Sequence, residues 1–168
     1  MNVIGVVGWK DTGKTTLVEK LIKEFNQRNF TVSTIKHAHH NFTMDRKGSD
    51  SFRHFNAGSR ETIVASQKKW VKFSRQLGKS DIDLNYLLKQ VSCADIIIVE
   101  GFKASSHNKI EVIELQNQRE PLFRNDTTIC GLIFNKNKIN NTKLPQFERD
   151  NVGAICDFIE KILGVSKS

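Results

Sequence analysis

The sequence predicts an α/β fold with a mainly parallel sheet and helices on both faces. Two observations support this prediction. Short runs of β-branched residues alternate along the chain with stretches whose apolar residues recur at helical spacing. One of those runs, 95–101 (DIIIVEG), is apolar almost throughout, as expected of a parallel strand buried on both faces. The 168 residues contain no internal repeat, low-complexity tract or linker, so we expect a single domain over residues 1–168.

The first predicted elements follow from short patterns near the start of the chain. Residues 3–7 form a β-branched run that predicts a buried strand. Apolar residues recur at helical spacing over 17–25, and Asn29 suits the left-handed residue that ends a helix. Residues 31–35 predict a second strand. The polar stretch 36–60 predicts a long loop with one short helix.

The later elements include a predicted hairpin. Residues 62–65 and 70–73 are strand-like and would be joined at 66–69, and pairing of this hairpin with the main sheet would make that sheet mixed. Ser80, with Asp83 as its capping-box partner, opens a predicted helix. The apolar stripe of that helix is Leu84, Leu87, Leu88 and Val91. The remaining predictions are strands at 95–101, 110–115 and 128–134, and a helix over 152–163 that Gly164 ends.

Composition excludes several classes of protein. No apolar run approaches the roughly 18 residues of a membrane helix, and the start MNVIGVVG lacks a basic region and a cleavage site. The widely spaced Cys93, Cys130 and Cys156 offer no disulfide framework and no metal knuckle. We therefore expect a cytoplasmic protein with no membrane partner.

Positive charge is concentrated in one part of the chain. The net charge is +8, with 15 basic and 6 acidic residues in 1–80 against 11 and 12 in 81–168. The window 36–79 holds 10 basic and 3 acidic residues and four of the five histidines. This distribution predicts an anionic partner, which could be a nucleotide, another phosphorylated small molecule or nucleic acid.

Residues 8–16 (GWKDTGKTT) fit the phosphate-binding pattern G-x-x-x-x-G-K-[ST] and lie between a predicted strand and a predicted helix. Gly8 and Gly13 would let backbone N–H groups curl around phosphates at a helix N-terminus. Lys14 is expected to bridge the β- and γ-phosphates, and the Thr15 hydroxyl to bind Mg²⁺. The predicted fold is therefore that of a P-loop NTPase.

Such a loop needs a carboxylate at the tip of a neighbouring strand to hold Mg²⁺ or its water. Asp95 and Glu100 lie at opposite ends of one predicted strand, about 16 Å apart at ~3.3 Å per residue. Only Glu100 lies at the carboxyl end, where ligands of parallel sheets gather, and Gly101 would allow close backbone approach. Lys14 and Glu100 are thus the candidate catalytic residues, and Thr15 and Glu100 the candidate metal ligands.

A histidine-rich segment, KHAHH at 36–40, follows the second predicted strand. Its candidate residues are Lys36, His37, His39 and His40. They could contact phosphate or a partner, contribute to a Zn²⁺ or Ni²⁺ site, or form a solvated loop, and the residues leave these alternatives open. Downstream, Asp45 or Asp50 could help to position Mg²⁺, although a turn and a helix cap explain them nearly as well.

The base of the nucleotide is not specified by the residues alone. Many GTPases read guanine with an N-K-x-D motif after a late strand. Asn135 and Lys136 stand in that context, but Lys138 replaces the Asp.

Several motifs together resemble the molybdopterin-guanine dinucleotide biosynthesis protein B (MobB) family. They are GWKDTGKTT at 8–16, IKHAHH at 35–40, GSDSFRHFNAGS at 48–59, TIVAS at 62–66 and IIIVEGFK at 96–103. Their order and spacing match the family over about the first 115 residues, and the last third of the chain is much less diagnostic.

The resemblance implies a homodimer that binds GTP with Mg²⁺ and has at most slow GTPase activity. It also implies a role in assisting a molybdenum cofactor guanylyltransferase, which attaches GMP to molybdopterin. The nucleotide residues implied by the motif are Gly8, Thr12, Gly13, Lys14, Thr15 and Thr16, with Glu100 and Gly101 at the Walker B position. The family's His-rich and Asp-Ser segments correspond to Lys36, His37, His39, His40, Asp50 and Ser51.

Three other functions remain as alternatives. A small-molecule kinase would usually carry an arginine-rich lid, and only Arg119, Arg124 and Arg149 follow residue 100. A metal-insertion GTPase could use the histidines to deliver nickel. A nucleic-acid-binding module would fit the charge, but the sequence lacks an aromatic stacking motif. We identify no glutamine or arginine finger in the sequence. Such a finger increases the rate of hydrolysis about 10³–10⁵-fold, so its absence from the identifiable motifs agrees with slow hydrolysis.

Overall fold

The computed structural model describes residues 1–38, 45–75, 82–114 and 119–167. Its contacts divide the chain into two compact units, Met1–His37 with Leu84–Ser168 and Ala38–Asp83. The single domain expected over residues 1–168 stays a prediction.

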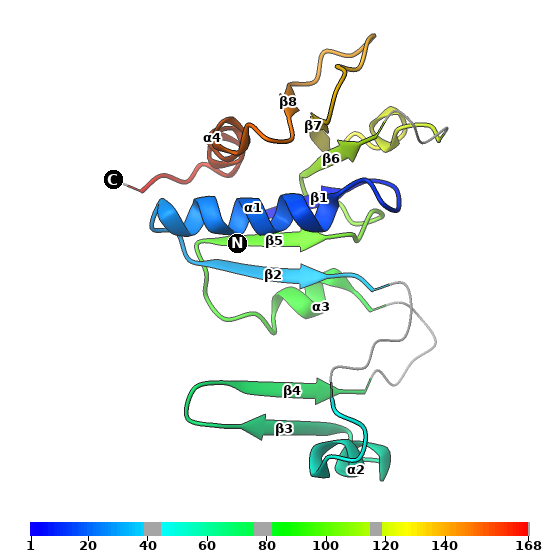
Figure 1. The fold of residues 1–168 in the computed structure, drawn as a ribbon, viewed down its shortest axis with the longest axis vertical. Helices are drawn as coiled ribbons and strands as arrows, with labels where there is room; N and C mark the ends of the chain where they lie inside the picture. Colours follow the sequence, from blue (N-terminus) through cyan, green and yellow to red (C-terminus); the bar gives the residue numbers. More distant parts are fainter. Residues whose placement is uncertain (39–44, 76–81, 115–118, 168) are drawn as a thin grey trace. The chain divides into compact units, whose positions relative to one another are not determined.

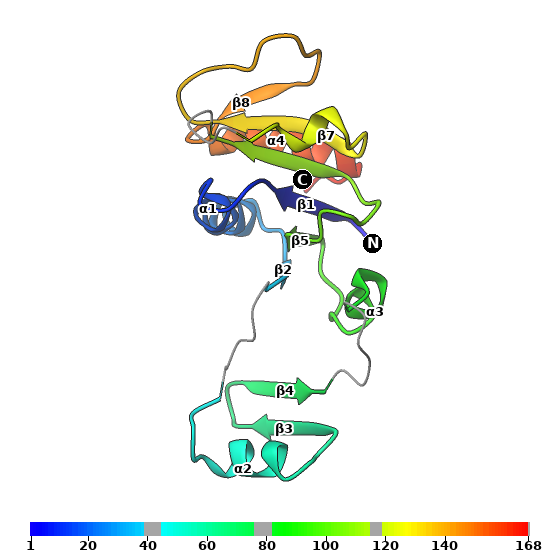
Figure 2. The same cartoon turned by 90° about the vertical axis from the view of Figure 1, so that its right-hand side faces the viewer.

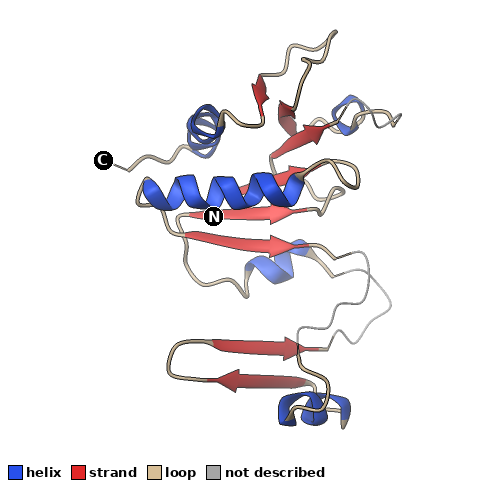
Figure 3. Cartoon of the chain, viewed as in Figure 1, coloured by secondary structure: helices blue, strands red, loops and turns tan. Residues whose placement is uncertain are grey.

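The larger unit is built on a six-stranded sheet (Figure 1, Figure 3). In chain order its strands are β1 (Val3–Val7), β2 (Val32–Lys36), β5 (Ile96–Glu100), β6 (Lys109–Ile113), β7 (Ile129–Phe134) and β8 (Gln146–Glu148). Their order across the sheet is β2-β5-β1-β6-β7-β8, and every neighbouring pair is parallel. The carboxyl ends of all six strands therefore share one edge, where a ligand is expected.

Helices cover both faces of this sheet, as predicted. Two long helices, α1 (Lys14–Gln27) and α4 (Val152–Leu163), contact each other and the sheet. The short α3 (Leu84–Leu88) lies on the opposite side of the sheet from α1 (Figure 2). The main core joins the apolar faces of α1 and α4 to β1, β5 and β6, and a second cluster on β7 packs under η1 (Leu122–Arg124). Burial of these side chains stabilises the unit by about 1.5–3 kcal/mol for each large aliphatic residue.

The smaller unit contains α2 (Asp50–Asn56) and a hairpin of β3 (Glu61–Ala65) and β4 (Trp70–Ser74). The hairpin is confirmed, but its predicted pairing with the main sheet is wrong. Its two strands form a sheet of their own, so among the described strands the main sheet is wholly parallel. The alternation of apolar and polar residues predicts that two neighbouring strands form a hairpin. It does not predict whether that hairpin pairs with a strand of another sheet.

Most predicted helix ends are confirmed by the backbone. Asn29 (φ 63°) and Gly164 (φ 65°) both have the left-handed conformation that ends a helix. The prediction for α3 was too long, because the helix begins at Leu84 and Val91 lies beyond it, while Ser80 lies outside the described residues. Within the described ranges, no helix combines the length and the apolar character needed to cross a bilayer.

Candidate functional site

The loop between β1 and α1 has the backbone geometry of a phosphate-binding loop. Gly8 (φ 147°) and Gly13 (φ 85°) both have positive φ angles, which glycine adopts without steric cost. A Cβ atom on Gly8 would lie 2.4 Å from the Val112 carbonyl oxygen, so a side chain has no room there. Gly13 directly precedes α1. Because the first N–H groups of a helix have no partner within it, this terminus can bind an anion.

The Lys14 side chain folds back over this loop. Its Nζ atom donates a hydrogen bond to the Trp9 carbonyl oxygen (2.6 Å), which also accepts one from the hydroxyl of the buried Thr12 (3.0 Å). Burial, together with the nearby Lys103 ammonium, lowers the pKa of Lys14. An ammonium group has three donors, so Lys14 retains capacity for a phosphate, whose negative charge would favour its protonated form.

Thr15, Lys36 and Glu100 form a cluster beside the loop. The Thr15 hydroxyl donates to Glu100 Oε1 (2.8 Å) and accepts from Lys36 Nζ (3.1 Å). Lys36 Nζ lies 3.2 Å from the same carboxylate oxygen. The three side chains come from α1, β2 and β5, and they meet because the parallel register sets Lys36 directly opposite Glu100. The parallel register of β1 and β5 pairs Glu100 with Val6, just before the loop.

The oxygen atoms of this cluster suit Mg²⁺. Here the Lys36 ammonium contacts one hydroxyl oxygen and one carboxylate oxygen, so the two oxygens already converge on a cation. Mg²⁺ prefers oxygen ligands and is commonly held by one or two protein side chains together with waters and phosphate oxygens. Thr15 and Glu100 therefore fit the predicted metal position.

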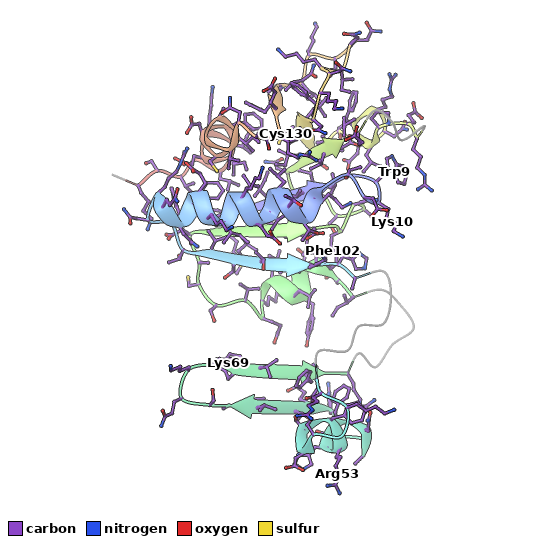
Figure 4. The ribbon with its side chains drawn as sticks, viewed as in Figure 1. Trp9, Lys10, Arg53, Lys69, Phe102 and Cys130 are labelled. Atoms are coloured by element: carbon purple, nitrogen blue, oxygen red, sulfur yellow. The ribbon has the colours of Figure 1, made fainter. Side chains whose placement is uncertain are left out.

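Gly101 and His37 adjoin the backbone of Glu100. The His37 backbone N–H donates to the Glu100 carbonyl oxygen (2.9 Å), and the His37 ring stacks on Phe102 with 4.5 Å between ring centroids. A Cβ atom on Gly101 would lie 2.9 Å from His37 Cβ. Phe102, labelled in Figure 4, has an unusual positive φ angle of 51°. Strain of about 1–3 kcal/mol is typical of such residues at functional sites, and here burial of the Phe102 ring offsets it.

Comparison with known proteins identifies the family. The family model described as molybdopterin guanine dinucleotide synthesis protein B, MobB, matches residues 3–135. The chain belongs to this family. It is 35% identical over 164 residues to the molybdopterin-guanine dinucleotide biosynthesis adapter protein of Haemophilus influenzae, covering 96% of this chain and 89% of the relative. It is 37% identical over 110 residues to the Escherichia coli adapter protein of the same name, covering 64% and 63%.

Solved MobB structures confirm the fold. The crystal structure of a MobB homolog from Bacillus stearothermophilus superposes with a TM-score of 0.75 at 22% identity, covering 98% of this chain and 99% of that one. Bacillus subtilis MobB gives a TM-score of 0.75 at 24% identity, covering 100% and 99%. The predicted family and the predicted α/β P-loop fold are thus both confirmed. Membership in the MobB family supports an accessory role in molybdopterin guanine dinucleotide synthesis.

The structure brings some of the predicted site residues together and leaves others apart. Gly8, Thr12, Gly13, Lys14, Thr15, Lys36, His37, Glu100 and Gly101 gather at the carboxyl ends of β1, β2 and β5. Thr16 is exposed on the first turn of α1. Asp50 and Ser51 belong to the smaller unit, and His39 and His40 lie outside the described residues. Contacts of all these residues with a nucleotide stay predictions.

In the smaller unit the downstream acidic residues have structural partners. The Asp45 carboxylate accepts from the Ser49 hydroxyl (2.9 Å) and the Arg46 backbone N–H (2.8 Å). Ser49 in turn caps α2 by accepting from the Phe52 backbone N–H (3.2 Å). Asp50 begins that helix. Among the described residues no group of three His, Cys, Asp or Glu side chains is arranged to hold a metal ion. The nickel-delivery alternative depends on His39 and His40 and stays untested.

Sequence reasoning did not identify Arg149 as a site residue. A Cβ atom on Gly13 would lie 2.6 Å from an Arg149 guanidinium nitrogen, so this cation borders the phosphate loop. Arg149 follows β8, and its backbone N–H donates to the Phe134 carbonyl oxygen (2.8 Å) at the end of β7. Asn135 and Lys136 come next after β7, in the context of an N-K-x-D motif whose Asp is replaced by Lys138. Because β8 has only three residues and was not predicted, no sequence signal connected Arg149 to the loop.

Proposed function

We propose that this MobB chain is a GTP-binding adapter protein. In this role it assists a molybdenum cofactor guanylyltransferase in attaching GMP to molybdopterin. One observation carries the proposal: Lys14, Thr15 and Glu100 converge on the phosphate-binding loop at the carboxyl ends of β1 and β5. The relatives of this chain are named adapter proteins of this synthesis.

Each residue of the cluster has a role in binding GTP with Mg²⁺. The N-terminus of α1 and the Lys14 ammonium would bind the β- and γ-phosphates, while the Thr15 hydroxyl and the Glu100 carboxylate would hold Mg²⁺ or its water. Bound Mg²⁺ neutralises part of the phosphate charge. Lys36 would move from its pair with Glu100 toward the phosphates, because Mg²⁺ and the ammonium compete for the same oxygen atoms.

Slow hydrolysis of GTP is consistent with the same contacts. The Glu100 side chain is mostly buried, and it is engaged by the Thr15 hydroxyl and the Lys36 ammonium. In the GTP-bound state the same carboxylate would hold Mg²⁺ or its water, so it would not be available to orient an attacking water. An adapter that keeps its nucleotide intact would suit a role in delivering GTP to a partner enzyme.

A test of the proposed function reconstitutes the synthesis with purified components. Molybdopterin, GTP with Mg²⁺ and a limiting amount of the guanylyltransferase are incubated with or without this chain, and the dinucleotide formed is quantified by chromatography. We expect the chain to increase the yield severalfold. An unchanged yield at every ratio of the two proteins would contradict the adapter role. The Lys23→Ala variant, which is altered at an exposed residue of α1, is the control and should increase the yield as the wild type does.

The homodimer implied by the family resemblance is part of the same proposal. Among the described residues of Ala38–Asp83 only Thr62 is buried, so the described part of this unit contains no apolar core. Units of this size rarely bury enough surface alone. Strand register places Ile63 and Trp70 on the hairpin face opposite Thr62 and Phe73, and their exposed fractions are 63% and 66%. A second copy of the chain would cover Ile63 and Trp70 on this face, which also carries the Glu61–Lys72 ion pair.

Glutamate at both exposed positions, Ile63→Glu with Trp70→Glu, is expected to convert the dimer to a monomer. Burial of each apolar side chain contributes about 1.5–3 kcal/mol, and a buried unpaired carboxylate would cost more than that gain. Sedimentation equilibrium at micromolar concentration measures the change. The control is Gln67→Glu with Lys68→Gln, which lowers the net charge by the same two units in the turn of the hairpin. A wild-type chain that sediments as a monomer would refute the proposed dimer.

A further inference from the structure

A pocket lies beside the phosphate-binding loop and is not used by the nucleotide contacts described above. Its volume is about 600 Å³. Ligand pockets commonly span about 300–1,000 Å³. The side chains that the argument uses are Trp9, Lys103, Ala104, Arg119, Pro121 and Leu122. Figure 4 shows Trp9 on the loop between β1 and α1. The pocket thus combines an aromatic and aliphatic lining with two cations, and the acidic residues Glu120 and Asp126 also line it.

Both cations lie against the Trp9 ring. Lys103 Nζ is 4.4 Å and the Arg119 guanidinium carbon 4.9 Å from the ring centroid. Within the described part of the chain, no carboxylate forms an ion pair with either of them. Burial and the neighbouring Arg119 guanidinium lower the pKa of Lys103. The Glu111 carboxylate acts on Lys103 only electrostatically, and two adjacent cations without an ion-paired carboxylate favour an anion between them.

The walls of the pocket are held in place by hydrogen bonds. The Trp9 indole N–H donates to the Glu120 carbonyl oxygen (2.9 Å) and fixes the ring against residues 119–121. The carboxylate of the buried Glu111 accepts from the backbone N–H groups of Leu122 (2.7 Å) and Phe123 (2.9 Å). These contacts secure η1, which carries the apolar wall. A pocket shaped before binding loses less entropy when a ligand enters.

We propose that this pocket binds a phosphate monoester carried on a planar aromatic body. The phosphate lies between the Lys103 ammonium and the Arg119 guanidinium, and the aromatic body packs against Trp9, Pro121 and Leu122. This inference rests on the proposed function for its biological meaning, because molybdopterin, a pterin with a phosphate monoester, belongs to this chemical class. The phosphate monoester thus binds to residues other than Thr15, Lys36 and Glu100.

Trp9 connects the pocket to the nucleotide site. Its carbonyl oxygen accepts the Lys14 hydrogen bond, while its ring lines the pocket. Lys103 also acts electrostatically on Lys14. A phosphate at Lys103 and a nucleotide at Lys14 can therefore occupy neighbouring sites at the same edge of the sheet. Such an arrangement would place a phosphorylated pterin and GTP side by side.

The experiment measures binding of 6-hydroxymethylpterin phosphate by isothermal titration calorimetry. The protein is first saturated with GTP and Mg²⁺, so that the phosphate-binding loop is filled. We expect the monoester to bind at least tenfold more tightly than inorganic phosphate or 6-hydroxymethylpterin alone. We also expect it to bind the Lys14→Ala variant, which lacks the principal nucleotide contact. Competition between the monoester and GTP would overturn the proposal, because the pocket would then belong to the nucleotide site.

A pair of double variants tests the residues. Lys103→Ala with Arg119→Ala is expected to weaken binding of the monoester at least tenfold, whereas Lys23→Ala with Lys161→Ala removes the same charge at exposed helix positions and should not. Thermal unfolding checks that both proteins are folded. Equal affinity in the two double variants would overturn the proposal. Binding of GTP is titrated separately on the wild-type protein, so a failure of the proposed nucleotide function is distinguished from a failure of the pocket.

Discussion

Replacing Lys14 with alanine is expected to weaken binding of GTP at least 100-fold. Lys14 begins α1 and reaches back over the loop, where its Nζ atom already donates to the Trp9 carbonyl oxygen. A hydrogen bond between charged groups contributes about 1.5–3 kcal/mol, and Lys14 would make two such bonds to the β- and γ-phosphates. A loss of about 3 kcal/mol of binding free energy raises the dissociation constant for GTP by a factor above 100.

The fold should survive this substitution. Alanine is the best helix former, and the change removes one hydrogen bond and a half-buried charge while leaving Gly8 and Gly13 in place. Isothermal titration with GTP and Mg²⁺ measures the affinity, and circular dichroism measures the fold. Lys10→Ala is the matched control, because Lys10 is an exposed lysine of the same loop (Figure 4). Micromolar affinity retained by the Lys14→Ala variant would contradict the assignment of this loop to nucleotide binding.

The parts of the fold that could be predicted from the sequence are those encoded locally. A β-branched run, a glycine-rich turn and an apolar stripe at helical spacing specify β1, the loop and α1 within about 25 consecutive residues. Glu100 could be predicted for a related reason. The end of a buried strand is visible in the sequence, and all carboxyl ends of a parallel sheet share one edge.

The contacts that the sequence did not reveal depend on register and on long-range packing. Lys36 meets Glu100 because β2 and β5 are paired in one particular register, and a shift of one residue would turn these side chains to opposite faces. Arg149 borders Gly13 only because the short β8 pairs with β7. Arg119 approaches the Trp9 ring from 110 positions away in the chain. No local pattern carries such information.

The Glu100→Gln variant is expected to change the affinity for GTP in opposite directions with and without Mg²⁺. Glutamine keeps the size of the side chain, and its carbonyl oxygen can still accept from the Thr15 hydroxyl. The negative charge beside the phosphates disappears. Without Mg²⁺, GTP should therefore bind more tightly than in the wild type, because repulsion is relieved and Lys36 is released from its pair.

With Mg²⁺ the same substitution removes a group that holds the ion or its water. The gain in GTP affinity on adding Mg²⁺ should therefore fall at least tenfold, which corresponds to about 1.4 kcal/mol of binding free energy. Titration of GTP at fixed Mg²⁺ concentrations measures this gain directly. Glu19→Gln, at an exposed residue of α1, controls for the change in net charge. If Glu100 were only a surface acid after a core strand, both variants would keep the wild-type gain. A uniform loss of affinity at every Mg²⁺ concentration would instead indicate a damaged loop, so the change of sign identifies the metal role.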